Sequence, residues 1–411
     1  MTVSVPLDAR AGGPDLARGI ALLGIALANL VGWLHGSAWT VLLKQQDASA
    51  ADRVVDVLLA LLVDNRGFPL FALLFGYGIG ILRRRSLERG ERTGRFLRRM
   101  LRRHLVLLAI GLSHAILLFS GDILMPYAII GLLCAVLVTR HRLLLAAAAL
   151  ITLPALGVWG WVDGTIGLGG STGYAAASAP DYLTGVGIRA PEALRDTLLA
   201  PIEEIGLLSP MALGALMARA RLLEDVPAHR LRLAQLARWG LAVGLLGAVP
   251  LTAVLVLDPA HAHLDSELLL GTLGVLHQIS GLAGGIGLAA AAALVAERFR
   301  ARLQGGEPVP LGRLVRGVEA LGAASLSAYL AQSLLCLALF PPYTLDLGAQ
   351  LGTAGAAVLA LAGWLLMLPL AALLARRGRR GPMEHLLRVL AGSGASRVNH
   401  GRASRDGGGE R

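Results

Sequence analysis

The chain of 411 residues is 55% hydrophobic, only 16% charged, and carries a formal net charge of +11. A soluble protein has about 25% charged residues, spread along its length. Here the apolar residues form runs of roughly 17 to 29 residues with charge in the breaks between them, as membrane-spanning helices require. This pattern excludes a soluble globular fold, a coiled coil and a disordered chain, and the lack of period-two alternation excludes a β-barrel.

Ten segments have the length and apolarity of membrane spans. They lie at 19–43, 65–82, 104–119, 122–139, 143–162, 198–218, 233–257, 268–296, 317–340 and 347–375. The sequence therefore predicts an all-α, polytopic helical membrane protein with about ten transmembrane helices. Residues 16–375 form its single multi-pass domain, between a cytoplasmic segment 1–15 and a basic cytoplasmic tail 376–411 that is disordered at its end.

The positive charge is concentrated in two places, which indicates the orientation in the membrane. Segment 83–104 holds ten arginines against two glutamates, and the tail holds nine arginines against three acids. They contribute +8 and +6, so the remaining residues sum to −3. Because cytoplasmic loops accumulate Arg and Lys, both segments are expected inside, and both termini are cytoplasmic. Nucleic-acid binding is not needed to explain the charge.

Two segments on the outer face are irregular. Residues 52–66 predict an amphipathic helix that leads through Gly67 and Pro69 into a short second span. A broken backbone at membrane depth is tolerated only against protein or a water-filled cavity. The outer loop 163–196 is rich in Gly, Ser, Ala and Pro and predicts a mobile cover.

Ionisable side chains within spans are costly in lipid and are therefore the first functional candidates. His114 lies about eleven residues into the third span, and Asp122 begins the fourth after a turn at Gly121. We expect Asp122 to lie ~12 Å higher than His114, which argues against direct pairing. Two interpretations stay open for each: His114 is functional or bonds a neighbouring helix, and Asp122 is functional or caps the fourth helix.

Further candidates lie in three other spans. His277 lies at a similar depth in the eighth span, which suits a proton relay, a substrate site or a polar knot between helices. Glu203 and Glu204 lie about one turn into the sixth span, and one of them is expected to face the membrane interior. In the first span Asp15 and Arg18 are three residues apart, so they fall on one helix face and can pair.

The first span also holds Asn29 at depth and His35 near its outer end, beside two tryptophans typical of a membrane interface. The arginines of 83–103 suit the phosphates of acyl-CoA, or else serve as positive-inside and anionic-lipid anchors. The chain has no phosphate-cradling Gly-rich loop, metal-ligand spacing or nucleophile elbow. We therefore expect no metal and no bound cofactor.

Five segments in this order resemble the YeiB-like bacterial membrane proteins, the domain-of-unknown-function family 418. They are DLARGIALLGIALAN, FPLFALLFGYGIGIL, RRHLVLLAIGLSHAILLFSGDILMPYAIIGLL, LSAYLAQSLL and GPMEHLLR. The resemblance runs from about Asp15 to Arg388, with a C-terminal core at about 205–390. The GxxHxxLxxxGDIL motif and the C-terminal pieces match at His114, Gly121, Asp122, Ile123, Leu124, Tyr329, Gln332, Ser333, Gly381, Pro382, Glu384 and Arg388.

Two positions depart from the family pattern. Where the family has Gly-Arg, this chain has Gly322 and then Ala323, and the aromatic usual after Pro-x-Glu is His385. Any role of the missing arginine therefore does not carry over to this chain.

The family is similar to the wider transmembrane acyltransferase group, which includes the acyltransferase-3 proteins and the heparan glucosaminide acetyltransferases. The resemblance implies a protein of the bacterial cell membrane that moves an acyl group from cytosolic acyl-CoA to an extracytoplasmic glycan or lipid acceptor. The predicted catalytic residues are His114, Asp122 and His35, with His35 as the counterpart of that group's catalytic histidine. The predicted substrate-binding residues are Asp15, Arg18, Asn29, His277, Glu203, Tyr329 and Gln332.

An alternative function is a secondary transporter or flippase for a small amphiphile. It would use His114, His277 and the Glu203–Glu204 pair as a proton pathway. The broken second span favours it, and no internal repeat is visible to support it.

Overall fold

The computed structural model describes residues 12–305 and 311–392. Within these ranges every regular element is a helix, apart from one isolated bridge between Trp39 and Gln45, so the all-α prediction is confirmed. The first eleven residues of the expected cytoplasmic segment, and the end of the tail that we expect to be disordered, lie outside the described residues.

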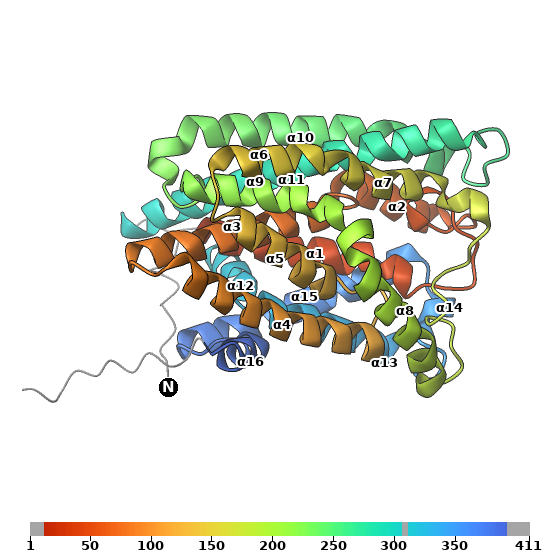
Figure 1. Ribbon diagram of the computed structural model, residues 1–411. Coiled ribbons are helices and arrows are strands. Elements are labelled where there is room, and N and C mark those ends of the chain that lie inside the picture. Colours follow the sequence, from red (N-terminus) through yellow and green to blue (C-terminus); the bar gives the residue numbers. More distant parts are fainter. Residues whose placement is uncertain (1–11, 306–310, 393–411) are drawn as a thin grey trace, which may run out of the picture.

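Most of the long helices lie side by side in a bundle, roughly along one common axis (Figure 1). Their bounds are α1 (Gly12–Ala28), η2 (Asn29–Gly32), η3 (Val41–Leu43), α2 (Ala50–Leu62), α3 (Gly67–Glu88), α4 (Thr93–Leu117), α5 (Leu124–Leu137), α6 (Arg142–Ile151), α7 (Leu153–Thr165), η4 (Ile166–Gly169), α8 (Tyr182–Glu203), η5 (Ile205–Leu207), α9 (Leu208–Arg219), α10 (Val226–Leu257), α11 (Glu267–Gln304), α12 (Gly312–Ala323), α13 (Ser325–Leu339), α14 (Leu347–Gln350), α15 (Thr353–Arg376) and α16 (Pro382–Leu390).

Seven helical segments of the described chain are long and apolar enough to cross a membrane, or up to nine if two bent pairs count as one span each. These pairs are α8 with η5 and α9, bent by 54°, and α12 with α13, bent by 92°. Helix α5 is apolar but has only 14 residues. It is thus ~21 Å long, shorter than the ~30 Å hydrocarbon layer. The chain is a multi-pass helical membrane protein. The lengths and apolarity of the described helices do not confirm the predicted count of ten spans.

The ends of the bundle separate the loops into two groups. Figure 1 shows the arginine-rich turn between α3 and α4 at the same end as α16. The segments 166–181 and 258–266 lie at the opposite end. This is the grouping that the charge pattern predicts, and the assignment of the arginine-rich end to the cytoplasm stays a prediction.

Close backbone contacts through small residues hold the spans together. A Cβ on Gly76 of α3 would overlap the carbonyl oxygen of Met211 in α9. A Cβ on Gly274 of α11 would likewise overlap the carbonyl oxygen of Gly160 in α7. Because lipid tails are as apolar as leucine, helices in a bilayer associate mainly by such tight packing and by interhelical hydrogen bonds.

The outer segment 163–196 differs from the mobile cover that its composition predicts. From Tyr182 onward it is helix α8, whose N-terminus is capped by Asp181 through the backbone N–H of Thr184 at 2.9 Å. Arg189 of α8 is buried and donates through Nε to the carbonyl of Ile116 at 2.9 Å. The contact of Arg189 fixes the helix against the end of α4.

The loop between α10 and α11 is held by one carboxylate. Asp258 accepts hydrogen bonds from the backbone N–H groups of His263, Leu264 and Ala262, at 2.7, 2.6 and 2.8 Å. These bonds stabilise the charged form and lower the pKa of Asp258 from its usual 3.8.

We therefore expect Asp258→Asn to lower the melting temperature in detergent at neutral pH. A lowered carboxyl pKa contributes stability above the unfolded pKa and loses it as the pH falls through the folded value. The difference in melting temperature between the wild type and Asp258→Asn should thus shrink when the pH is brought to about 3. A difference of equal size at both pH values would contradict this assignment.

Candidate functional site

His114 lies at the centre of a hydrogen-bonded chain that also contains a carboxylate and a hydroxyl. Its Nδ1 is 2.7 Å from Asp122 Oδ1, and its Nε2 is 2.8 Å from Ser333 Oγ. His114 lies in α4, Asp122 in the turn before α5, and Ser333 in α13, and all three are buried. In this arrangement an imidazole can accept the hydroxyl proton while the carboxylate orients the ring.

The expected vertical offset between Asp122 and His114 is wrong because α4 ends early. Helix α4 stops at Leu117, and the backbone N–H groups of Leu118 and Phe119 both bond to the carbonyl of His114. The chain then turns back toward the helix it has just left. Asp122 is thereby returned to the level of His114.

Asp122 also caps α5, so both interpretations of this residue hold at once. Its Oδ2 accepts from the backbone N–H of Met125 at 2.7 Å, while Oδ1 contacts His114. The N-terminus of α5 can approach α4 because position 111 is glycine, where a Cβ would press on the backbone of Met125. The cap and the close approach together hold the carboxylate in place.

Helix α13 presents three matched motif residues on one face, at positions i, i+3 and i+4. The ring of Tyr329 lies 4.9 Å from the ring of His114, and its hydroxyl accepts from the backbone N–H of Ile123 at 3.3 Å. Gln332 donates through Nε2 to the carbonyl of Leu22 at 3.3 Å. Tyr329 and Gln332 are predicted substrate-binding residues, and both lie beside the hydrogen-bonded chain of Asp122, His114 and Ser333.

Ser333 is the residue that the sequence reasoning missed as a site candidate. A single serine in an apolar span carries no signal of its own. The usable signal was its place directly after Gln332 and four residues after Tyr329, in a motif piece already matched to the family.

The position of α13 depends on the C-terminal motif. Glu384 of α16 accepts from the backbone N–H groups of Leu326 and Ser327, at 2.7 and 3.2 Å, and from the Ser327 hydroxyl at 2.5 Å. It thus satisfies N–H groups at the start of α13, directly after the 92° bend. Gly322, before the bend, packs on the carbonyl of Asp15, and Ala323 is the last residue of α12.

Two pockets adjoin the hydrogen-bonded chain. A narrow pocket of about 20 Å³ is lined by Asn29, Trp33, Tyr329, Gln332, Ser333 and Trp364, among others. A larger cavity of about 160 Å³ is lined by Asn29, Asn65, Asp122, Tyr127, Trp159 and Glu204, among others. Asn29 therefore borders both, at the point where α1 changes into the 3₁₀ turn η2.

The structure separates the two neighbouring glutamates. Glu204 lies at the break between α8 and η5 and lines the larger cavity. Glu203 is exposed, and its carboxylate is 2.9 Å from Arg195. Glu203, predicted to bind substrate, thus lies at the surface, and Glu204 takes the interior position.

Two predicted groups lie apart from the His114 chain. Asp15 and Arg18 pair at 2.9 Å, as their spacing predicts, and Arg18 also donates to the carbonyl of Leu74 at 3.2 Å. His35 follows η2, where its Nε2 is 3.7 Å from a carboxylate oxygen of Asp346. Neither group lines the two pockets.

His277 belongs to a second polar cluster, at the break between α2 and α3. Asn65 donates to Asp163 at 2.7 Å and lies 3.1 Å from His277 Nδ1. His277 Nε2 lies 2.9 Å from the carbonyl of Ala60. Because Asn65 also lines the larger cavity, this cavity borders both histidine clusters. No contact joins the two histidines directly among the described residues.

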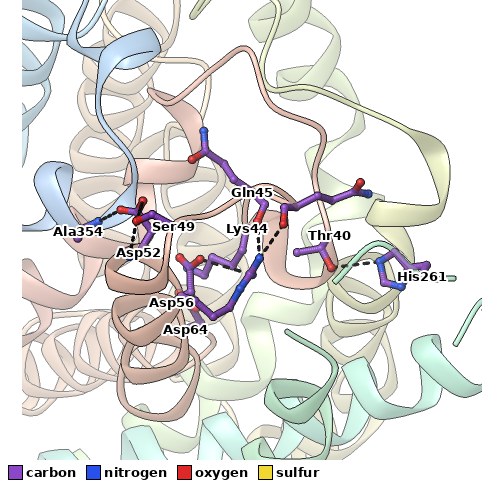
Figure 2. A network of polar contacts seen from close by, with 11 residues as sticks. Thr40, Lys44, Gln45, Ser49, Asp52, Asp56, Asp64, His261 and Ala354 are labelled. Carbon is purple, nitrogen blue, oxygen red and sulfur yellow. Dashed lines mark hydrogen bonds and ion pairs between the residues drawn. The ribbon is translucent and has the colours of Figure 1, made fainter. Parts of the chain in front are cut away.

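A buried ion pair adjoins this second cluster. Figure 2 shows Lys44 beside Asp56 and Asp64. The Lys44 ammonium is 2.9 Å from a carboxylate oxygen of Asp64. The Lys44 side chain is only 1% exposed, and Asp56 is fully buried. Arg66, also buried, donates to the carbonyls of Ala60 and Asp64 at 3.1 and 2.6 Å. The broken second span therefore carries its charges against protein, as an interrupted helix in lipid requires.

Part of the arginine-rich segment 83–103 is occupied by contacts within the protein. Arg84 is 2.6 Å from Glu224 and also donates to the carbonyl of Ala218. Arg99 is 3.0 Å from Glu91. The exposed arginines of the segment are Arg85, Arg89, Arg92, Arg95, Arg98 and Arg102.

Fold and site together define a multi-pass helical membrane protein with a Ser–His–Asp chain in its interior. Residues 217–393 match the family described as "Protein of unknown function (DUF418)". This part of the chain is thus similar to the DUF418 family, as the resemblance to the YeiB-like proteins predicts. The matched part contains Ser333 and Glu384, whereas His114 and Asp122 precede it.

Three bacterial proteins are similar to segments of the chain. Uncharacterized protein YxaH of Bacillus subtilis is 32% identical over 127 residues. An uncharacterized 39.9 kDa protein in the amylase 3′ region of Bacillus acidopullulyticus is 39% identical over 129 residues. Uncharacterized protein YeiB of Escherichia coli is 34% identical over 127 residues. The matches span 30%, 31% and 29% of this chain and 31%, 34% and 29% of these relatives. Each match thus covers about a third of the relative's length.

Proposed function

We propose that the protein transfers an acyl group from a cytosolic acyl thioester, such as acyl-CoA, to a hydroxyl acceptor. The observation that supports this proposal is the His114 imidazole, held between Asp122 and a hydroxyl at 2.7 and 2.8 Å. A hydroxyl that attacks a thioester must lose its proton as the new C–O bond forms. His114 accepts that proton, and Asp122 stabilises the resulting imidazolium.

The remaining partners follow from the charge pattern and the resemblance. The exposed arginines of segment 83–103 suit the phosphates of acyl-CoA at the predicted cytoplasmic end. The acceptor would be a glycan or lipid of the cell envelope, and the membrane would be the bacterial cell membrane. His35 has no contact with His114, so the proposal gives it no proton to transfer.

The test is binding of acyl-CoA to the purified protein, followed by release of free CoA on adding cell-envelope extract. We expect CoA release with the wild type and none above background with His114→Ala. Absence of both acyl-CoA binding and CoA release in the folded wild type would overturn the proposal.

The second candidate function is proton-coupled transport of a small amphiphile. It is supported by the cavity that borders both the His114–Asp122 pair and the cluster of Asn65 and His277. At about 160 Å³ this cavity is similar to the ~150 Å³ cavities that hold a benzene-sized molecule. Proton-coupled uptake into proteoliposomes that His114→Ala abolishes, without any CoA release, would favour transport over acyl transfer.

A further inference from the structure

We infer that Ser333 is the nucleophile of the reaction and holds the acyl group as a covalent ester between donor and acceptor. This inference rests on the proposed acyl transfer and names the hydroxyl that attacks the thioester. It assigns a catalytic role to Ser333, which neither the composition of the spans nor the spacing of their polar groups predicts.

The proton on His114 is placed by its partners. An ionised carboxylate only accepts hydrogen bonds, so the Nδ1 that faces Asp122 carries the proton. The neutral ring then presents the Nε2 lone pair to the Ser333 hydroxyl, which donates over 2.8 Å. This is the tautomer in which the ring can accept the serine proton.

The orientation of the ring is fixed on three sides. Asp122 is held by the backbone N–H of Met125, and Tyr329 packs its ring against the imidazole. Ser333 lies one helical turn after Tyr329 on the same face of α13. Base and nucleophile therefore come from packed helices, and the orienting carboxylate is held in the turn before α5 by its bond to the N-terminus of that helix.

The pocket beside Ser333 also has polar groups for the developing charge. The amide side chains of Asn29 and Gln332 line it, and an amide N–H can donate to the oxyanion of a tetrahedral intermediate. At about 20 Å³ the pocket has room for roughly one water molecule, so an acyl group can enter it only when the lining side chains move apart.

The acyl transfer takes place in two steps. In the first, Ser333 Oγ bonds to the thioester carbonyl carbon, its proton passes to His114 Nε2, and the C–S bond breaks. The thiolate leaves with the proton from the imidazolium as free thiol. In the second, the acceptor hydroxyl loses its proton to His114 and bonds to the ester carbonyl carbon. The bond to Oγ breaks, and the imidazolium returns a proton to Ser333.

The test uses the full-length protein in detergent with radiolabelled acetyl-CoA and no acceptor. We expect label on the peptide that contains Ser333, located by mass spectrometry, together with one free CoA per labelled chain. Ser333→Ala should lose the label and slow CoA release with envelope extract at least about a thousandfold. Ser333→Cys, which keeps the size of the side chain, should hold the acetyl group as a hydroxylamine-sensitive thioester.

The matched control is Ser209→Ala, a second buried serine, which lies in α9 and outside the site. It should keep the label, and all variants should bind acetyl-CoA and melt like the wild type. Wild-type CoA release by Ser333→Ala would overturn the role of Ser333 and leave acyl transfer standing. A folded wild type that neither binds acetyl-CoA nor releases CoA would overturn both.

Discussion

Asp122→Asn is expected to slow acyl transfer about ten thousandfold, by analogy with the same exchange in serine proteases. The carbonyl oxygen of the new amide would stay on the backbone N–H of Met125, since only an oxygen can accept there. The amide nitrogen would then face His114 Nδ1 and donate to it. This forces the proton of the ring onto Nε2, which can no longer accept from Ser333.

The measurement is the rate of CoA release with envelope extract, compared with the melting temperature of the same variant. We expect the rate to fall while the melting temperature changes little, because the cap of α5 keeps its acceptor. Glu203→Gln is the control, because it also removes one carboxylate but lies exposed at the surface. A rate within tenfold of the wild type would show that Asp122 serves only as a helix cap.

Lys44→Met is expected to cost about 3–5 kcal/mol of folding stability. It leaves the buried carboxylate of Asp64, 2.9 Å from the ammonium, without its counter-ion, and removes the cation that lies beside Asp56 (Figure 2). Breaking one partner of a buried pair is costly because the remaining charge stays desolvated. The double variant Lys44→Met/Asp64→Asn, which removes both charges, should recover a large part of the loss.

Thermal unfolding in detergent measures this effect. Arg195→Met is the matched control, because it removes a cation from an ion pair of similar length at the surface, where Arg195 is 61% exposed. Exposed pairs contribute only about 0–1 kcal/mol. If Lys44→Met destabilises the protein no more than Arg195→Met does, the Lys44 network is not a structural element of the broken second span.

The sequence by itself determined the class of the protein and the candidate polar residues. Apolar runs bounded by arginines predict membrane helices, because lipid leaves no other place for such segments. The ion pair between Asp15 and Arg18 follows from local spacing alone, since i and i+3 share a helix face. The break before Gly67 was likewise visible in the sequence, through its polar residues and Pro69.

Only the tertiary structure decided which polar residues meet. The contact between His114 and Asp122 depends on α4 ending at Leu117 and on the chain folding back, and neither event has a periodic signal. Ser333 reaches His114 across 219 residues of sequence, after a 92° bend that Glu384 stabilises from α16. Such contacts depend on where whole helices pack, and hydrophobic patterning records only which face is apolar. The sequence therefore identified the membrane protein, and packing assembled the Ser–His–Asp chain within it.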